Sequence, residues 1–467
     1  MRLRRSHNLY NKQKGTNFME NTAMTSNISK QTANIPEMIL ADGVALYGKP
    51  GETRYNDNVL VVGPSGAGKT CSFVYPNLKL AMKKGEENLI LVLPKSSDLM
   101  ALNYLFGEAG YETYIVNLAE PDRSTISPDI LPFIHTDSDI ADLAEKVIWS
   151  KSPAGGGKID PYWNQKAGCL FKCAMSKAKR LRSNATIADA IFDMEDLDVE
   201  EEGSHVSTSW ERDINELIED YGRKDFAVKN YLHFAGLPIK TASCVVDTLD
   251  AAIHDMFSED LLSAMKKGEA LDLRRFVREK SVLFLVTSPV DTSSNAYANL
   301  FTSLVLKEFF EIAMREYGGV LPRKQRFVYD DFACGAMIKD FDKQISIFRS
   351  ASICCSLLLQ SESQLSAMYG KDAATTIINN CSTYIYMGGF DLDTCRNVSE
   401  RTNRPLDEIL KLPIGECYVM KYGSGEKPIL AKRYPILEDP FYRRMKRASE
   451  LFARPLNKDK KRKERSA

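Results

Sequence analysis

The stretch Gly63-Pro64-Ser65-Gly66-Ala67-Gly68-Lys69-Thr70 follows the pattern Gly-x-x-x-x-Gly-Lys-Ser/Thr of a phosphate-binding P-loop. A short apolar run, Asn58 to Gly63, leads into it, and an amphipathic segment from Lys69 to Lys84 follows. In such a strand–loop–helix unit, the glycines let successive backbone N–H groups point at phosphate oxygens, and the helix directs its positive end at the same anion. This context favours a nucleotide-binding loop over an ordinary glycine-rich turn.

The residue types of the loop predict its ligands. Lys69 supplies a mobile cation for the β- and γ-phosphates, and Thr70 supplies a hydroxyl for Mg²⁺. We therefore expect ATP and Mg²⁺ as cofactors. The candidate nucleotide-binding residues are Gly63, Pro64, Ser65, Gly66, Ala67, Gly68, Lys69, Thr70 and Cys71.

A P-loop enzyme also needs a carboxylate at the end of a neighbouring strand to hold the metal. Among the predicted strands, only Gln325 to Tyr329 runs straight into acids, Asp330 and Asp331. We assign Asp330, with Thr70, to the Mg²⁺ shell, and Asp331 to polarising the attacking water. The alternative is a solvated turn after the strand.

Two further polar residues are candidates for the catalytic set. Gln360 ends the strand after the acidic pair, where a polar side chain lies on the ligand edge of a parallel sheet and can sense the γ-phosphate or order water. Arg349 precedes that strand and can act as an arginine finger on a neighbouring subunit's nucleotide. A structural loop cap for Gln360 and a surface salt bridge for Arg349 are the alternatives.

Short apolar runs bounded by turn residues predict the strands. They are Asn58 to Gly63, Asn88 to Leu93, Glu112 to Asn117, Ser281 to Thr287, Gln325 to Tyr329, Ser352 to Leu359, Thr383 to Met387 and Glu416 to Met420. Most are continuously apolar, which is typical of strands buried on both faces of a parallel sheet covered by helices. Helix-like segments separate many of them, so the sequence predicts an α/β fold with a mostly parallel sheet.

The spacing of the motifs predicts an inserted domain. Lys69 and Asp330 lie 261 residues apart, much farther than in small P-loop enzymes. Between about Ile134 and Leu271 no convincing strand is found, and the region reads as successive helices. Both observations indicate an all-helical domain inserted into the α/β domain.

Composition excludes several other classes of protein. The chain has 467 residues, 44% of them hydrophobic and 27% charged, and no apolar stretch approaches the 18 residues of a membrane-spanning helix. The ten cysteines show neither CxxC nor zinc-ligand spacing, which is typical of reduced thiols in a cytoplasmic protein.

Charge is distributed unevenly along a chain whose net charge is zero. Residues 443–467 carry 11 Lys or Arg and 3 Asp or Glu, which predicts a solvated basic tail that promotes solubility or touches nucleic acid or anionic lipid. Residues 193–202 hold seven carboxylates, which we interpret as a solvated surface loop or a docking site for a basic partner.

With these motifs, the sequence resembles the conjugative coupling proteins of type IV secretion, the TraG/TraD-like P-loop NTPases. The resemblance runs from about Asp42 to Pro435 and rests on an ordered series of segments. They are GPSGAGKT, FVYPNL (Phe73 to Leu78), LVLPKSSDL (Leu91 to Leu99), GYETYIVNL (Gly110 to Leu118), DPYWNQKA (Asp160 to Ala167), RFVYDDFA (Arg326 to Ala333), LLLQSESQLSAMYG (Leu357 to Gly370), NNCSTYIYMGG (Asn379 to Gly389) and LPIGECYV (Leu412 to Val419).

The resemblance implies a RecA-like nucleotide-binding domain with an all-helical insertion, assembling as a homo-hexamer. We divide the chain into a flexible N-terminal segment (1–40), a discontinuous RecA-like domain (41–155 and 270–440), the all-helical insertion (156–269) and a basic C-terminal tail (441–467). Where the family usually has an Asp-Glu pair, this chain has Asp330-Asp331, and Leu93 stands where an Asp is expected. The family's N-terminal membrane helices are not found, so we expect a cytoplasmic protein that reaches the inner face of the membrane through a partner subunit or lipid.

The function that the resemblance implies is an ATP-driven coupling protein. It would recruit a relaxase–DNA complex and pump single-stranded DNA towards the proteins of the type IV secretion channel. An alternative from a different class is a docking platform that binds ATP and the relaxase complex but hydrolyses little. A soluble P-loop kinase is a third reading, which the long insertion disfavours.

Overall fold

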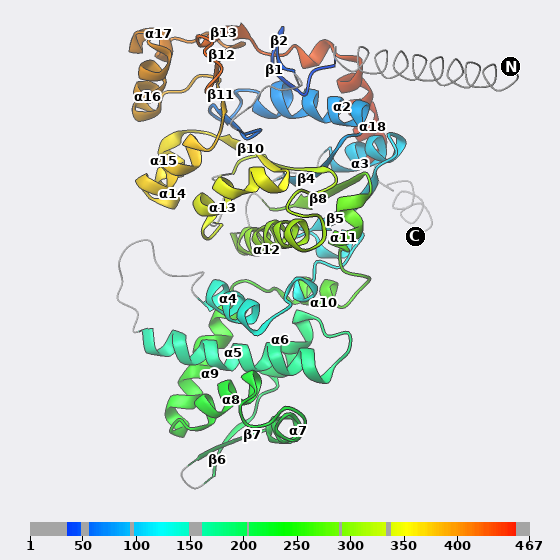
Figure 1. The fold of residues 1–467 in the computed structure, drawn as a ribbon, viewed down its shortest axis with the longest axis vertical. Helices are drawn as coiled ribbons and strands as arrows, with labels where there is room; N and C mark the ends of the chain where they lie inside the picture. The colour runs from blue at the N-terminus through cyan, green and yellow to red at the C-terminus, as the bar shows by residue number, and fades with distance from the viewer. Residues whose placement is uncertain are drawn as a thin grey trace, which may run out of the picture.

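The computed structural model describes residues 35–47, 56–93, 98–148, 161–202, 205–288, 292–332 and 338–453. Its centre is a nine-stranded sheet (Figure 1). The strands of this sheet are β3 (Val59–Val62), β4 (Glu87–Leu93), β5 (Glu112–Asn117), β8 (Ser281–Val286), β9 (Lys324–Tyr329), β10 (Ile353–Leu359), β11 (Thr383–Tyr386), β12 (Glu416–Lys421) and β13 (Ile429–Lys432).

The sheet is mostly parallel, which confirms the predicted fold class. Its order is β13-β12-β11-β3-β10-β9-β4-β8-β5, and every neighbouring pair from β11 to β5 is parallel. Only β12 and β13 add in the antiparallel sense, at one edge. All eight predicted strands are present, because each is an apolar run that a doubly covered sheet buries.

Helices cover both faces of the sheet. One face carries the P-loop helix, whose first turn is π-helical, with α2, α3 and α18; the other carries α11 to α15 (Figure 1). In β3, Val59 and Val61 pack towards the first layer and Leu60 and Val62 towards the second. The bounds are η1 (Thr70–Val74), α2 (Tyr75–Lys84), α3 (Leu99–Glu108), α11 (Leu273–Arg278), α12 (Thr292–Glu316), α13 (Phe341–Ile347), η4 (Phe348–Ala351), α14 (Glu362–Tyr369), α15 (Lys371–Asn379), α16 (Leu392–Thr402), α17 (Leu406–Leu410), η5 (Ile436–Glu438) and α18 (Pro440–Ala453). A small hairpin, β1 (Met38–Ala41) and β2 (Val44–Leu46), packs beside α2.

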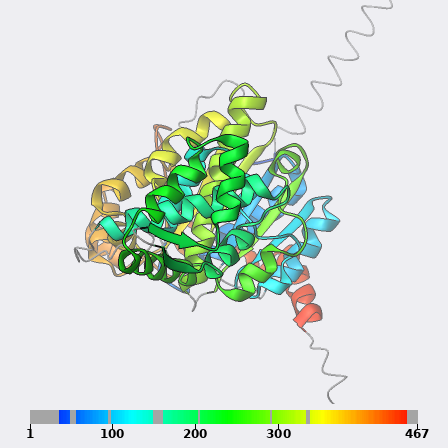
Figure 2. The ribbon, with the colours of Figure 1, turned by 90° about the horizontal axis from the view of Figure 1, so that it is seen from below.

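A mainly helical unit lies between β5 and β8 and projects from one face of the sheet (Figures 1 and 2). The chain reaches it through η2 (Pro121–Arg123) and η3 (Leu131–Phe133), and its elements are α4 (Asp137–Ile148), α5 (Pro161–Leu181), α6 (Ile187–Glu195), β6 (Val199–Glu202), β7 (His205–Thr208), α7 (Glu211–Tyr221), α8 (Phe226–Ala235), α9 (Ile239–His254) and α10 (Glu259–Met265). The prediction of an all-helical insertion is wrong at one place, because β6 and β7 pair as an antiparallel hairpin.

That hairpin also corrects the interpretation of the acidic run as a loop. Val199–Glu202 is a strand, and Asp193 on α6 accepts hydrogen bonds from Lys177 (3.0 Å) and Arg182 (2.7 Å). Glutamate has low strand propensity, so the sequence of β6 does not predict a strand, and pairing with β7 stabilises it instead.

The insertion and the sheet unit meet at α4. This helix packs against α5 and α9, although the predicted boundary placed it in the nucleotide-binding domain. Lys307 on α12 donates to Asp139 of α4 (2.6 Å), which ties α4 to the sheet unit as well. The boundary at 155/156 itself lies outside the described residues.

The C-terminal region differs from its prediction. Instead of a tail beginning at residue 441, Pro440–Ala453 forms α18 and packs against α3, with Met445 and Ala448 buried. Residues 454–467 and 1–34 lie outside the described residues. Among the helices that the structure describes, none has the length and apolarity needed to cross a membrane.

Candidate functional site

The P-loop and the acidic pair lie at the same edge of the sheet. The Gly63 N–H donates to the Leu359 carbonyl (3.1 Å), and the Asp330 N–H donates to the Val92 carbonyl (3.1 Å), so each residue extends its strand at the carboxyl edge. In parallel sheets this edge is where ligands bind. The fold therefore brings together Gly63 and Asp330, which are 267 positions apart in the chain.

The loop after β3 turns tightly because its glycines take conformations that other residues avoid. Gly66 and Gly68 both have φ of +79°, in the left-handed region. A Cβ atom at Gly63 would lie 3.0 Å from the Cβ of Met387, so the start of the loop needs glycine for close packing. The pattern of glycines thus has a local steric cause.

The ammonium group of Lys69 lies inside the loop. Its Nζ donates to the carbonyls of Gly63 (2.6 Å) and Pro64 (3.3 Å), and the residue is only 6% exposed. The loop therefore holds a buried cation beside the backbone N–H groups at the start of the helix. That arrangement suits a polyanionic ligand.

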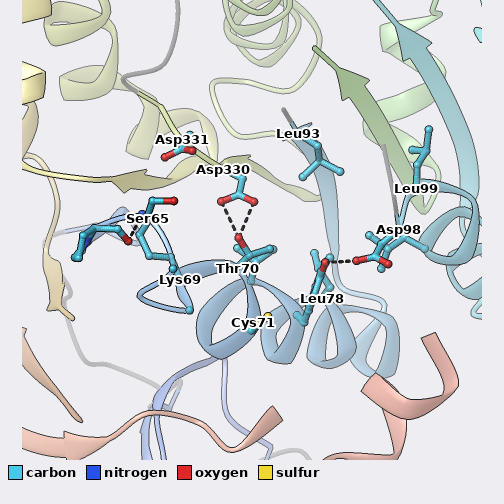
Figure 3. Close-up of a pocket in the computed structure, with 16 residues that line it drawn as sticks. Ser65, Lys69, Thr70, Cys71, Leu78, Leu93, Asp98, Leu99, Asp330 and Asp331 are labelled. Atoms are coloured by element: carbon cyan, nitrogen blue, oxygen red, sulfur yellow. Dashed lines mark hydrogen bonds between the residues drawn. The ribbon is translucent and has the colours of Figure 1, made fainter. Parts of the chain in front are cut away.

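Thr70 and Asp330 contact each other directly (Figure 3). The Thr70 hydroxyl lies 3.0 Å from Oδ1 and 2.8 Å from Oδ2 of Asp330. A hydroxyl and a carboxylate are hard oxygen ligands, and Mg²⁺ sites commonly use one or two such protein groups together with phosphate oxygens and water. The two residues therefore fit the magnesium position predicted for them.

Asp331 has a strained backbone next to this pair. Its φ is 72°, a conformation uncommon for a non-glycine residue. Its Oδ1 is buried, and in the part of the chain that the structure describes it has no hydrogen-bond partner. Strained residues and buried polar atoms without partners both concentrate at functional sites.

A pocket of about 370 Å³ opens over the P-loop and runs towards α3 (Figure 3). Its polar wall holds Lys69, Thr70, Asp98, Asp330 and Asp331, whereas leucines of α2, β4 and α3 form the apolar wall. Cys71 also lines it, and burial raises the pKa of its thiol, which keeps the thiol protonated at neutral pH.

A network from the C-terminal helix ends at the far side of this pocket. Asp98 accepts hydrogen bonds from Lys446 (2.8 Å) and Ser449 (2.8 Å) of α18 and from the Tyr75 hydroxyl (2.7 Å) of α2. Burial by itself raises the pKa of Asp98, but these hydrogen bonds outweigh it and hold the pKa below its usual value. The helix α18 is thereby attached to a wall of the site.

A second residue that the sequence did not indicate is Arg433, which follows β13. Its guanidinium donates to the carbonyls of Ala67 in the P-loop, Met387 (2.7 Å) and Glu416 (3.0 Å), and its own N–H donates to the Gly415 carbonyl (2.7 Å). Burial lowers the pKa of Arg433, but the group stays a cation. One arginine thus joins the P-loop to the ends of β11 and β12.

Gln360 and Arg349 lie at opposite ends of strand β10. Gln360 directly follows Leu359, whose carbonyl contacts Gly63, so it stands beside the start of the P-loop. Arg349 is exposed in η4, before β10 begins, and the length of β10, about 20 Å, separates that end from the P-loop. Arg349 therefore does not line the P-loop of its own chain.

Besides Asp98 of the pocket wall, the residues missed from sequence join the site from the C-terminal region. Arg433 and Lys446 contact groups 366 and 348 positions away. Lys446 lies in the stretch interpreted as a basic tail. Met445 and Ala448, which are both buried, are three residues apart, a spacing that places them on one face of a helix. The prediction missed this spacing because it was based on the many charged residues of the stretch.

Comparison with known proteins agrees with this architecture. The family described as "Type IV secretory system Conjugative DNA transfer" matches residues 14–403. No match is found among curated proteins.

Two solved structures of the bacterial conjugative coupling protein TrwB are similar. One, in complex with sulphate, has a TM-score of 0.57 and 17% identity and covers 87% of this chain and 92% of that one. The other, in complex with the ATP analogue ADPNP, has a TM-score of 0.58 and 16% identity and covers 87% and 91%.

The structure of VirB4 of Thermoanaerobacter pseudethanolicus is similar as well, with a TM-score of 0.54, 12% identity and coverage of 88% and 98%. These likenesses show a P-loop NTPase fold. Since the family match spans more than half of the sequence, the chain belongs to the conjugative DNA transfer family of type IV secretory systems, as its motifs predicted.

Proposed function

We propose that the chain is an ATP-driven coupling protein that moves single-stranded DNA, with its attached relaxase, towards a type IV secretion channel. The observation that carries this proposal is the contact between Thr70 and Asp330. It supports a single magnesium–triphosphate site assembled from two distant motifs. The TrwB structures with ADPNP and with ADP and Mg²⁺ support the same ligands.

In the proposed reaction, the P-loop amides and Lys69 bind and orient the triphosphate, and Thr70 and Asp330 would hold Mg²⁺. When bound, Mg²⁺ supplies charge neutralisation of the phosphates. Asp331 accepts a proton from the attacking water through its buried carboxylate, and Gln360 orients that water. Positioning and charge stabilisation provide most of the rate enhancement in phosphoryl transfer.

The assembly that we propose is a homo-hexameric ring around the DNA strand. Arg349, exposed at the edge opposite the P-loop, would reach a neighbour's nucleotide as an arginine finger. The protein would act at the inner face of the cell membrane, with a membrane partner subunit. Because the net charge is zero, DNA contacts would be confined to loops that face the pore.

The test is ATP turnover by the purified chain with and without single-stranded DNA. We expect turnover that DNA stimulates, and we expect Lys69→Ala to lower it at least about 100-fold, because the variant loses the cation that stabilises the developing charge. A matched control is Lys427→Ala, since Lys427 is exposed between β12 and β13, at the end of this hairpin away from the P-loop. Binding of ATP and relaxase without turnover would instead support the docking platform, and normal turnover in Lys69→Ala would reject the site.

A further inference from the structure

Two large apolar side chains are almost fully exposed at the edge of the sheet that carries the P-loop. Phe390 is 86% exposed and Ile414 is 98% exposed, which are the highest values among the exposed large apolar side chains of the described residues. Phe390 follows β11, and Ile414 precedes β12, which pairs with β11. Since exposing these side chains to water is unfavourable, their position next to a ligand site needs an explanation.

Both loops are fixed to the P-loop. Arg433 joins the carbonyls of Ala67 and Met387, and its N–H holds Gly415, the neighbour of Ile414. A Cβ atom at Gly389 would lie 3.8 Å from Cδ of Pro64, so the residue before Phe390 approaches the P-loop closely. Phe390 is therefore carried by a loop that packs against the phosphate cradle.

Thr70 and Asp330, the two residues that would hold Mg²⁺, set the direction in which a nucleotide would lie. Thr70 follows the P-loop after β3 and Asp330 follows β9, so their contact places the metal end between these strands, over β10 and on one side of β3. The pocket towards α3 lies on that same side, because β4 pairs with β9. The strand β11 flanks β3 on the other side, so the nucleoside end, which points away from the metal, is directed towards the loop of Phe390.

We propose that Phe390 is the platform on which the nucleotide base stacks, with Ile414 on the adjacent loop before β12. This inference rests on the proposed nucleotide-binding function. An aromatic ring offers its face to any purine, so the platform selects a nucleotide over a bare polyphosphate but discriminates weakly between ATP and GTP. Arg433 is the positioning residue that fixes the loop of Phe390 relative to the P-loop, through its hydrogen bonds to the carbonyls of Met387 and Ala67.

The test compares the affinities of ATP and of inorganic tripolyphosphate, each with Mg²⁺, by calorimetry on the full chain. We expect Phe390→Ala to weaken ATP binding about five- to hundredfold and to leave tripolyphosphate binding unchanged, because stacking is lost and the cradle is intact. Phe390→Tyr should bind ATP as the wild type does. Tyr422→Ala is the matched control, since Tyr422 is an exposed aromatic at the opposite end of β12.

A second readout is the tryptophan fluorescence of Phe390→Trp. The wild type, which has three tryptophans, is measured in parallel to give their contribution. The fluorescence of the added tryptophan should be quenched by ATP and not by tripolyphosphate. Unchanged ATP affinity in Phe390→Ala, or equal loss of both ligands, would overturn the platform while leaving the nucleotide site in place. A change in sedimentation of the nucleotide-free variant with unchanged ATP affinity would assign Phe390 to a subunit contact instead. If the wild type binds neither ligand, the proposed function itself fails.

Discussion

At the scale of single residues, the site combines groups that a local pattern reveals with groups that only the fold brings near. Lys69, Thr70 and Asp330 were predictable because a P-loop has a fixed spacing and because only one predicted strand ends in acids. Arg433 was not, since an arginine after an edge strand carries no local signal, and its three carbonyl partners come from distant loops.

Asp331 gives the first prediction at this scale. Asp331→Asn should lower the turnover number about 100-fold or more and leave ATP affinity unchanged, because the amide cannot accept the proton of the attacking water. Steady-state kinetics and calorimetry measure the two effects. Asp331→Gly keeps the left-handed backbone, whose φ is 72°, without strain. If this variant is as stable as the wild type and loses as much turnover as Asp331→Asn, the loss is due to the missing carboxylate and not to a change in backbone strain. Wild-type turnover in Asp331→Asn would assign the proton transfer to another group.

At the scale of elements, eight strands of the central sheet were predictable, whereas β13, the β6–β7 hairpin and the C-terminal helix were not. A short continuous apolar run can bury all its side chains as a strand of a sheet that helices cover on both faces. For this reason β3, β4 and β8 to β12 match their predictions. The residues of α18 bury only a narrow apolar stripe, including Met445 and Ala448, and their charges resemble those of a solvated segment. Packing on α3 decides the outcome, and a charge count cannot detect it.

A prediction for α18 follows from its ion pair with the pocket wall. Lys446→Met should lower the free energy of unfolding by about 0.5–1 kcal/mol at pH 7, a value reduced by the solvent exposure of the lysine, which is 41%. The Asp98 pKa is depressed in the folded state, so this contribution is present above the pKa of an unfolded Asp, about 4, and is lost as the pH falls through the folded value.

Urea denaturation at pH 7 and at pH 3 measures this effect, with Lys427→Met as the control for loss of an exposed charge. A deficit of Lys446→Met that is as large at pH 3 as at pH 7 would show that the ion pair with Asp98 is not its cause.

At the scale of the whole molecule, the insertion is joined to the sheet unit through buried polar contacts. Asp129, in the segment between β5 and α4, accepts hydrogen bonds from the N–H groups of Ile187 (3.0 Å) and Leu131 (3.3 Å). Tyr297 of α12 donates to the Pro128 carbonyl (2.7 Å). The existence of an insertion was predictable from the motif spacing, whereas its hairpin and the position of α4 depend on tertiary contacts.

Asp129 predicts a pH dependence of stability at this junction. Burial raises its pKa to about 6, against the lowering effect of its hydrogen bonds. A raised carboxyl pKa means that the folded chain holds the proton longer, so this group lowers stability as the pH rises from the pKa of an unfolded Asp, about 4, to about 6. Relative to the wild type, Asp129→Asn should therefore gain about 1 kcal/mol between pH 5 and pH 7.5. Denaturation at both values measures it, and a relative loss with rising pH would contradict the assignment.

The central claim is that Thr70 and Asp330 hold one magnesium ion on a triphosphate bound by the P-loop. Electron paramagnetic resonance of Mn²⁺, used in place of Mg²⁺ with a non-hydrolysable ATP analogue, tests it in the wild type, in Asp330→Asn and in Asp247→Asn, whose residue is exposed on α9 of the insertion. The account predicts a bound-manganese signal in the wild type and the control, and a metal affinity at least about tenfold weaker in Asp330→Asn. Equal manganese affinity in all three proteins would contradict it.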